Sequence, residues 1–405
     1  MGSSWSLRLW CKNYGWSGFV SLVFFVVNPA LEWFWAYRWG RARHCGMLFD
    51  SGRFSHPWFP VDSITQAALG AAVGYACWSK PLGRKALPLG LALGTLPDLD
   101  IVVYPLLDEV QQLYWHRGES HSVWFLILGS WLTAWLLRRL PLTRELSARR
   151  AWWGVLAIYT THVLIDVFTV YGTQLLAPFS RHGFGTNNLF IIDPLFTVPL
   201  LGGILGATML WSERLRVGIN TMGLALTTAY LGWSFVSQAV AGRAFEQALQ
   251  EQGIEAQRSL TSASAFNTIL WRHLVETEEG VLIGYWSWFD AGDAPITFRL
   301  VPRNAAAVQA VAESRSFAVV DWFSQGWWAV VNTEPGKATV IDLRFGEIPT
   351  VPGQRLQDLA WPFAWDFDLA AGEEAPLVQR SPEIDSFDAT LDLLWQRIRG
   401  ESPSW

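Results

Sequence analysis

Charged residues are scarce in this chain. Only 16% of its 405 residues are Asp, Glu, Lys or Arg, whereas 51% are hydrophobic, 26 are Trp and the mean hydropathy is +0.20. This balance excludes an ordinary water-soluble protein of this length and indicates a membrane protein. Cysteine is also rare, and Cys11, Cys45 and Cys77 form no CxxC pair. The composition therefore excludes a disulfide framework and a cysteine-rich zinc module.

The second part of the chain lacks clusters of basic residues. Residues 1–245 carry 19 Lys or Arg against 12 Asp or Glu, net +7, and residues 246–405 carry 11 against 23, net −12, which sum to −5. Nucleic-acid binding is excluded for the acidic part, because phosphate contacts need clustered Lys and Arg. This part also has no nucleotide-binding glycine loop or nucleophile elbow. The change of charge predicts a domain boundary near Arg243.

Hydrophobic segments in the first part predict several membrane spans. Residues 63–79, 122–137, 151–177, 194–212 and 217–242 are predominantly apolar, and residues 86–97 are too short to cross alone and predict a re-entrant helix. Small residues at 68, 70, 71, 72 and 74 predict close helix packing. We therefore expect an N-terminal extension (1–60) with an anchor-like segment at 15–30, a predominantly α-helical multi-pass membrane domain (61–243) and an extramembrane domain (244–405).

The extramembrane domain is expected to be α+β or mostly β. Residues 280–289, 296–301, 326–331 and 338–343 are rich in β-branched and aromatic residues and are bounded by Gly, Asp and Pro, which predicts strands. Residues 245–255 predict a short amphipathic helix that continues from the membrane.

Basic residues predict the orientation in the membrane. The turn at 80–85, the loop at 138–150 and the pair Arg214 and Arg216 fall on one side of the predicted zigzag of spans. The positive-inside rule makes that side cytoplasmic. The acidic domain would then face the other side, which is the periplasm in a Gram-negative bacterium.

His and Asp residues gather in three short segments on that outer side. On a helix, His162 and Asp166 project from one face of an otherwise apolar segment, where an unpaired charge is costly. Asp98 and Asp100 suit an extended loop that points both side chains the same way. His116 and His121 are five residues apart, a spacing that fits a loop entering a helix. The predicted metal ligands are Asp98, Asp100, His116, His121, His162 and Asp166.

The same motifs resemble a known family. The motifs are Asp62-Ser-Ile-Thr-Gln66, Leu96-Pro-Asp-Leu-Asp100, His116-Arg-Gly-Glu-Ser-His-Ser122, His162-x-x-x-Asp166, Gly172-Thr173, Pro178-Phe-Ser180 and Ile192-Asp-Pro-Leu195. Together they resemble the YdjM-type family of inner-membrane, predicted metal-dependent hydrolases over residues 61–245. The resemblance implies a multi-pass bacterial inner-membrane protein, a divalent metal and a hydrolytic activity. Gln66 departs from the His found there in many relatives, and the layout is also distantly similar to zinc-dependent phospholipases C.

We therefore expect a membrane-bound hydrolase that uses metal-activated water on an ester or phosphoester. The substrate would be a small molecule or a lipid, held at the membrane surface. Imidazole ligands favour Zn²⁺, and the carboxylates also suit Mn²⁺. Glu119 is the candidate general base, with Asp100 as the alternative if it is not a ligand. Arg117 and Arg181 would stabilise an anionic group, or would contact lipid headgroups.

Two other classes of function stay open at this point. Intramembrane His and Asp residues also form ion or proton paths in transporters, although the hydropathy order shows no inverted repeat. The membrane part could also be a scaffold with a degenerate metal site, with the acidic domain binding a protein partner. His182 and Asp193 are expected to fix the loop at 178–193, and His44, His56 and His273 are expected to be structural.

Overall fold

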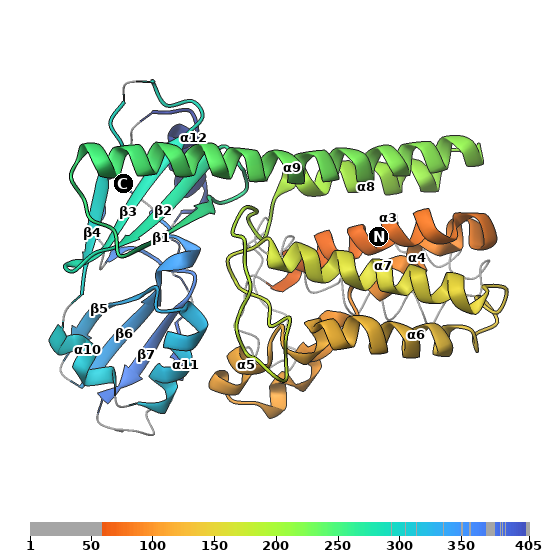
Figure 1. The fold of residues 1–405 in the computed structure, drawn as a ribbon, viewed down its shortest axis with the longest axis horizontal. Coiled ribbons are helices and arrows are strands. Elements are labelled where there is room, and N and C mark those ends of the chain that lie inside the picture. The colour runs from red at the N-terminus through yellow and green to blue at the C-terminus, as the bar shows by residue number, and fades with distance from the viewer. Residues whose placement is uncertain are drawn as a thin grey trace, which may run out of the picture.

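The computed structural model describes residues 59–401, except 293, 304, 313, 335, 350, 356–357, 370–376, 381, 383 and 385. The predicted anchor at 15–30 lies outside the described residues, as do Cys11, Cys45, His44 and His56. A helical bundle and a pair of β-sheets lie side by side along the long axis of the molecule (Figure 1). The predicted helical domain and the α+β character of the C-terminal part are confirmed.

The bundle contains the helices that the apolar segments predicted. The membrane span expected at 151–177 is only partly helical, because α7 ends at Val167 and the chain then continues as a loop. The long helices are α3 (Phe59–Leu82), α7 (Ala148–Val167), α8 (Pro194–Met209) and α9 (Glu213–Glu251), and the shorter ones are α4 (Ala86–Gly94) and α6 (Ser130–Leu137). Short elements join them: η1 (Gly83–Lys85), the 3₁₀ helix η2 (Pro97–Leu106), α5 (Glu109–Trp115), η3 (Glu119–His121) and the π-helical turn η4 (Phe125–Gly129).

The lengths and hydropathies of the individual helices do not by themselves identify membrane-spanning segments in the bundle. Among the described residues, none of the individual helices is both long enough and apolar enough to cross a membrane. Two pairs of consecutive helical segments satisfy both conditions only when combined, with bends of 44° and 59° at short breaks. The outer surface of the bundle is nevertheless apolar, with side chains such as Leu128, Trp131, Val198 and Leu205 more than half exposed. Such a continuous apolar surface is typical of contact with lipid or a partner.

Glycine residues allow α3 and α4 to pack against each other at close range, as the small-residue pattern predicted. A Cβ added to Gly70 would lie 2.5 Å from the carbonyl oxygen of Gly90 and 2.6 Å from the Cα of Gly94. A Cβ on Gly90 would lie 2.3 Å from the carbonyl oxygen of Gly70. Only glycine fits at such backbone contacts.

The predicted basic segments meet at one end of the bundle, the end away from the sheets (Figure 1). The Arg84 side chain donates to the carbonyl oxygen of Leu210 at 2.6 Å, and Arg216 donates to the hydroxyl of Tyr75 at 3.4 Å. The zigzag of helices that the positive-inside argument assumed is therefore present.

The C-terminal part contains, within the described residues, two four-stranded antiparallel sheets. Their strand orders follow the sequence, β1-β2-β3-β4 and β5-β6-β7-β8. The first sheet comprises β1 (Arg258–Ala263), β2 (Leu270–Glu276), β3 (Gly280–Ser287) and β4 (Phe298–Pro302), and the second comprises β5 (Trp328–Glu334), β6 (Lys337–Asp342), β7 (Ala364–Asp368) and β8 (Leu377–Gln379). The remaining elements are α10 (Ala305–Ala312), α11 (Arg315–Ser324), η5 (Leu343–Phe345) and α12 (Phe387–Ile398).

Helix α9 joins the two parts without a break. It runs over 39 residues from the basic end of the bundle to the first sheet (Figure 1), so the short helix expected at 245–255 is its last portion. The charge boundary near Arg243 lies inside this helix.

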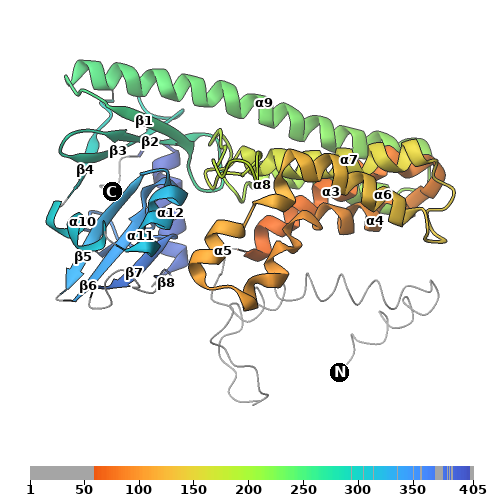
Figure 2. The same cartoon turned by 60° about the horizontal axis from the view of Figure 1, so that its bottom comes forward.

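The two parts also share a core. Leu113 of α5 is buried in the cluster formed by α10, α11 and the second sheet, and Tyr171 packs against the same cluster. In both views α5 lies at the end of the bundle that faces this sheet (Figures 1 and 2). Trp322 Nε1 donates to the carbonyl oxygen of Arg181 at 2.9 Å, and Gln325 Nε2 donates to that of Gly183 at 2.6 Å. The C-terminal domain is thus fixed to the loops that carry the predicted site.

Candidate metal centre

Among the described residues, four of the predicted ligands converge. Asp98 comes from η2, His121 from η3, and His162 and Asp166 from successive turns of α7. One ligand atom from each lies within 4.8 Å of all the others. Of these four residues, His121, His162 and Asp166 are almost fully buried. The predicted convergence of three sequence segments is therefore present for these residues, which we call the four-residue cluster.

The spacing of the four atoms suits a tetrahedral ion. His121 Nε2 lies 3.2 Å from Asp98 Oδ1, 3.2 Å from Asp166 Oδ2 and 3.2 Å from His162 Nε2. His162 Nε2 lies 3.3 Å from Asp98 Oδ1 and 3.5 Å from Asp166 Oδ2. A regular tetrahedron with ligands about 2.0–2.1 Å from zinc has edges of about 3.3–3.4 Å. Five of the six distances among the four ligand atoms have nearly this length, and all six lie within 4.8 Å.

The backbone of α4 orients one of the imidazoles. His162 Nδ1 lies 2.7 Å from the carbonyl oxygen of Gly94, which can only accept a hydrogen bond. The proton of a neutral His162 is therefore on Nδ1, and Nε2 presents its lone pair to the cluster. This is the usual support of a metal-ligating histidine. Nδ1 of His121 similarly lies 2.9 Å from Ser120 Oγ.

Asp166 divides its two oxygens between the protein and the cluster. Oδ1 accepts from Gln66 Nε2 at 3.0 Å and lies 3.0 Å from the guanidinium NH2 of Arg117. Oδ2 is buried, and the polar atoms near it are the cluster nitrogens, His121 Nε2 and His162 Nε2; when these nitrogens present lone pairs, Oδ2 has no hydrogen-bond donor among the described residues. A buried carboxylate oxygen is costly when it is left unsatisfied. This atom therefore fits a cation at the centre of the cluster.

Arg117 acts as the counter-ion of Asp166. Its NH1 donates to Thr169 Oγ1 at 3.1 Å, its guanidinium lies 4.9 Å from the ring centre of Tyr171, and its side chain is 2% exposed. Its backbone has a φ of +52°, which turns the side chain into the protein. Two carboxylates and one guanidinium leave a net charge of −1 beside neutral imidazoles, which favours a cation at this position.

Asp100 and His116 lie outside the four-residue cluster. The expectation that Asp98 and Asp100 point the same way is wrong, because they belong to a 3₁₀ helix, where residues two apart face different directions. Asp100 Oδ2 instead lies 3.4 Å from His116 Nδ1 and accepts from the backbone N–H of Arg117 at 3.1 Å. The two residues form an Asp–His pair next to the cluster.

Glu119 and Arg181 pair with each other. Arg181 NH1 donates to Glu119 Oε2 at 3.1 Å, and a second short contact joins NH2 to Oε1. The guanidinium also lies 4.6 Å from the ring centre of Tyr114 and 5.2 Å from that of Trp115. The structure does not bring either charge into the four-residue cluster. Their predicted roles in catalysis stay predictions.

The remaining polar candidates support the surroundings. Asp193 caps α8, accepting from the N–H of Leu195 at 2.9 Å and from the hydroxyl of Tyr230 at 2.7 Å. Burial raises the pKa of Asp193 to about 6. His273 stacks on Phe245 in the C-terminal part, and burial lowers its pKa to about 4. His182 contacts the ring of Phe184 edge-on.

A pocket opens beside the cluster, and we call it the site pocket. Asp98, His116 and Arg117 lie on one side of it. The opposite side comes from the C-terminal domain, through Phe345, Phe363 and Gln379. Its empty space is about 1220 Å³, part of it open to solvent. Glu109, Gln112 and Thr169 also line it, and the remaining lining residues are apolar or aromatic: Ile101, Tyr104, Leu113, Val170, Tyr171, Phe190, Ile191 and Pro362.

Two residues that support the cluster were not predicted from the sequence. Gly94 offers its carbonyl oxygen to His162, and Thr169 positions Arg117. Thr169 follows Asp166 by three residues, and the spacing of the motifs does not single it out. Gln66, at the position where many relatives have His, holds Asp166 by a hydrogen bond.

The fold and the four-residue cluster define an apolar helical domain in which two histidines and two aspartates could hold a cation. Residues 61–241 match the family model described as YdjM inner membrane protein. This match confirms the resemblance to the YdjM inner membrane protein family that the motifs predicted for this part of the chain.

Two relatives cover the same region. The uncharacterized protein YfhP of Bacillus subtilis (strain 168) is 26% identical over 172 residues, which are 40% of this chain and 50% of YfhP. The inner membrane protein YbcI of Escherichia coli (strain K12) is 26% identical over 172 residues, which are 37% of this chain and 98% of YbcI. The match thus spans about half the length of YfhP. No solved structure matches the chain.

Proposed function

We propose that the helical domain is a membrane-bound, metal-dependent hydrolase whose ion is held by Asp98, His121, His162 and Asp166. The observation that carries this proposal is the convergence of four ligand atoms, all within 4.8 Å of one another and five pairs of them at 3.2–3.5 Å. Two imidazoles and two carboxylates suit Zn²⁺, with Mn²⁺ as the alternative. A divalent ion bound there would supply Lewis acidity and lower the pKa of water toward neutrality. The substrate would be an ester or a phosphoester.

The chain's own residues support a division of labour around the ion. Asp98 is the most exposed of the four ligands, at 18%, and it lines the site pocket. His116 lines the same pocket with Asp100 beside its Nδ1. A carboxylate behind an imidazole fixes its tautomer and orientation for proton transfer. We therefore assign proton transfer to the His116 and Asp100 pair. Arg117 has the role of holding Asp166 in place.

The apolar bundle surface and the inner-membrane relatives support a multi-pass arrangement. We place the basic end of the bundle in the cytoplasm by the positive-inside rule. The cluster and the acidic domain would then be periplasmic. Single cysteines at Arg144 and at Glu251, in a chain without native cysteines, test this orientation. An impermeant maleimide added to intact cells should label only the cysteine at position 251, and the reverse pattern would invert the assignment.

One feature favours a second candidate function. Four protein ligands complete a tetrahedron, which is typical of structural zinc, whereas catalytic zinc keeps a position open. In that case the ion would join η2, η3 and α7 without taking part in a reaction. The two candidates predict different effects of His116, which is needed only by the hydrolase.

Metal content and hydrolysis in matched variants test both candidates. The detergent-purified chain should carry about one equivalent of zinc or manganese, and the His121→Ala/His162→Ala double variant should lose it. His116→Ala should keep the metal and lose hydrolysis of p-nitrophenyl ester and phosphoester probes. His182→Ala, outside the cluster, is the control. No metal in the wild-type protein, even after reconstitution, would contradict both candidates, and bound metal without hydrolysis of any probe would favour the structural one.

A further inference from the structure

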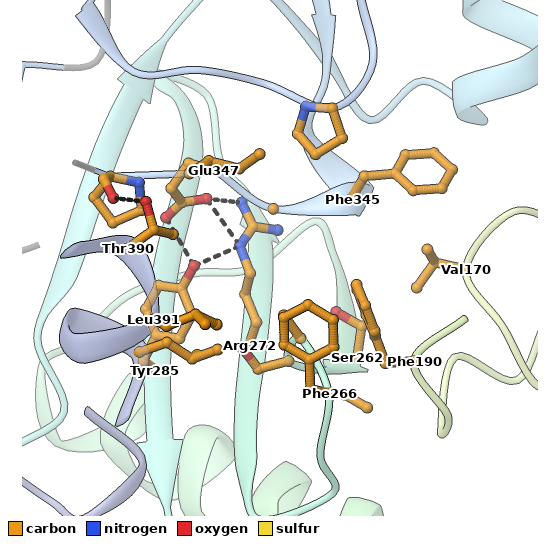
Figure 3. Close-up of a pocket in the computed structure, with 18 of the residues that line it drawn as sticks. Val170, Phe190, Ser262, Phe266, Arg272, Tyr285, Phe345, Glu347, Thr390 and Leu391 are labelled. Carbon is orange, nitrogen blue, oxygen red and sulfur yellow. Dashed lines mark hydrogen bonds and ion pairs between the residues drawn. The ribbon is translucent and has the colours of Figure 1, made fainter. Parts of the chain in front are cut away.

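A second cavity lies inside the C-terminal domain, and we call it the domain pocket. It is bounded by β1, β2, β3, the segment after η5 and helix α12 (Figure 3). Its empty space is about 870 Å³. Most of its lining is apolar, and the apolar side chains include Phe266, Ile348, Phe387, Leu391 and Leu394. The hydrolytic reaction proposed above has no use for an apolar cavity in this domain unless part of the substrate enters it.

The charged groups in the domain pocket are already paired. Arg272 NH2 lies 2.8 Å from Glu347 Oε2, and the hydroxyl of Tyr285 donates to Glu347 Oε1 at 2.8 Å (Figure 3). Arg272 and Glu347 are both more than 95% buried. Their charges therefore compensate each other, and the pocket offers an apolar surface to a ligand rather than an anion site.

The domain pocket and the site pocket share a wall. Val170, Phe190, Phe345 and Pro362 line both cavities. In Figure 3, Val170, Phe190 and Phe345 lie together on one side of the domain pocket. The two cavities are therefore neighbours, and these apolar side chains lie between Asp98 and His116 on one side and the interior of the C-terminal domain on the other.

The site pocket also borders an exposed apolar surface. Ile101 of η2 lines the pocket, and Val102 and Leu106 of the same element are 67% and 84% exposed. Exposed aliphatic groups at the end of a membrane domain are suited to the lipid interface. A ligand that is itself apolar could pass from the lipid to the pocket beside Ile101.

We propose that the two pockets together bind the hydrocarbon chain of a long-chain amphiphile. Its ester or phosphoester group would lie at Asp98 and His116, and its chain would follow the shared wall into the domain pocket. This inference deepens the proposed function, on which the position of the polar group rests. In this proposal the acidic C-terminal domain selects substrates by their hydrocarbon chain.

Photo-crosslinking tests the chain site without relying on catalysis. The probe is hexadecyl phosphate with a diazirine near the end of the chain, added to the full-length protein in nanodiscs and mapped by peptide mass spectrometry. Labelling should reach the peptides that contain Phe266 and Leu391. Excess unlabelled hexadecyl phosphate should compete, and butyl phosphate should not, because each buried methylene adds to binding.

Variants on one helix provide the matched comparison. Leu391→Trp fills the domain pocket and should lower labelling about tenfold, because the indole displaces part of the chain. Asp392→Trp places the same side chain on the exposed face of α12 and should leave labelling unchanged. The His121→Ala/His162→Ala double variant should still be labelled, since the chain site is apolar. The wild-type competition series stands alone if Leu391→Trp does not fold.

The outcomes separate this inference from the proposed function. Labelling confined to the outer surface of the bundle, in a protein that binds metal and hydrolyses short esters, would overturn the chain site and leave the hydrolase intact. Saturable labelling of the domain pocket in a protein that binds no metal would support the chain site and overturn the hydrolase.

Discussion

Arg117 NH2 lies 3.0 Å from Asp166 Oδ1, and the two side chains are only 2% and 1% exposed. The pair links the loop before η3 to the end of α7, so it fixes the direction from which Asp166 reaches the cluster. Breaking a buried ion pair by removing one partner typically costs about 3–5 kcal/mol, because the other charge stays buried. The relationship makes Arg117 a positioning residue for the metal ligand.

Replacing Arg117 with Met should therefore weaken metal binding. Loss of a group that supports a metal ligand commonly lowers affinity by about 10–100-fold. Chelator competition against zinc measures the effect. Arg149→Met, at an exposed position of α7, is the control and should bind zinc like the wild type. Equal affinity in the Arg117 variant would show that Asp166 does not depend on this pair.

Gln66→Leu should have a smaller effect on the same measurement. It removes one neutral hydrogen bond to Asp166 Oδ1 and leaves the ion pair with Arg117 in place. The lower end of the range for hydrogen bonds to charged groups, about 1.5 kcal/mol, corresponds to a fall in zinc affinity of about tenfold. A loss larger than that of Arg117→Met would reverse the ranking of these two supports.

Gly90→Ala should separate α3 from α4. The added Cβ would meet the carbonyl oxygen of Gly70 at 2.3 Å, a backbone atom that cannot move aside alone. Overpacking of this kind typically costs about 1–3 kcal/mol. Thermal unfolding in detergent measures it. Gly202→Ala on α8, where a Cβ meets nothing within 4 Å, is the control and should unfold at the wild-type temperature.

Arg344 should hold the loop that follows α7. Its guanidinium makes a buried ion pair with Asp342 and donates to the carbonyl oxygen of Val170 at 3.2 Å. Arg344→Leu should accelerate hydrogen exchange at residues 168–172, which contain Thr169 and Tyr171. Arg355→Leu removes an ion pair on the protein surface and should leave this exchange unchanged. Unaltered protection in Arg344→Leu would mean that the loop is held from the bundle side.

His273 should make the C-terminal domain less stable in mild acid. Burial lowers its pKa to about 4 in the folded chain, against about 6.5 when unfolded. The unfolded state then binds more protons below pH 6.5, so stability should fall by about 2 kcal/mol from pH 7 to pH 5. His273→Leu should lose this part of the pH dependence in thermal unfolding scans. An identical pH profile in the variant would refute the assignment.

Local periodicity was sufficient to predict part of the site. The spacing of four between His162 and Asp166 places both on one helical face whatever the surroundings, and α7 has this face. The small residues of α3 likewise predicted its close packing, since a missing Cβ is visible in the sequence. The distribution of charge alone predicted that the basic segments lie at the same end of the helices.

The sequence did not predict that Asp98 lies in the four-residue cluster while Asp100 pairs with His116. It depends on the 3₁₀ conformation of η2, which turns Asp98 and Asp100 apart, and on the positive φ of Arg117. Neither conformation follows from the spacing of residues in the sequence. The strands β1, β2, β7 and β8 were also missed, because charged residues such as Arg272 and Asp366 interrupt their apolar patterns and find partners only in the fold.

Helix α9 spans 39 residues, or about 58 Å at 1.5 Å per residue. One end of this rod packs among the bundle helices and the other packs against the first sheet. Because the helix is continuous, the direction of its bundle half also sets the direction of the half that carries the first sheet, so the two parts are joined by a stiff element rather than by a flexible linker.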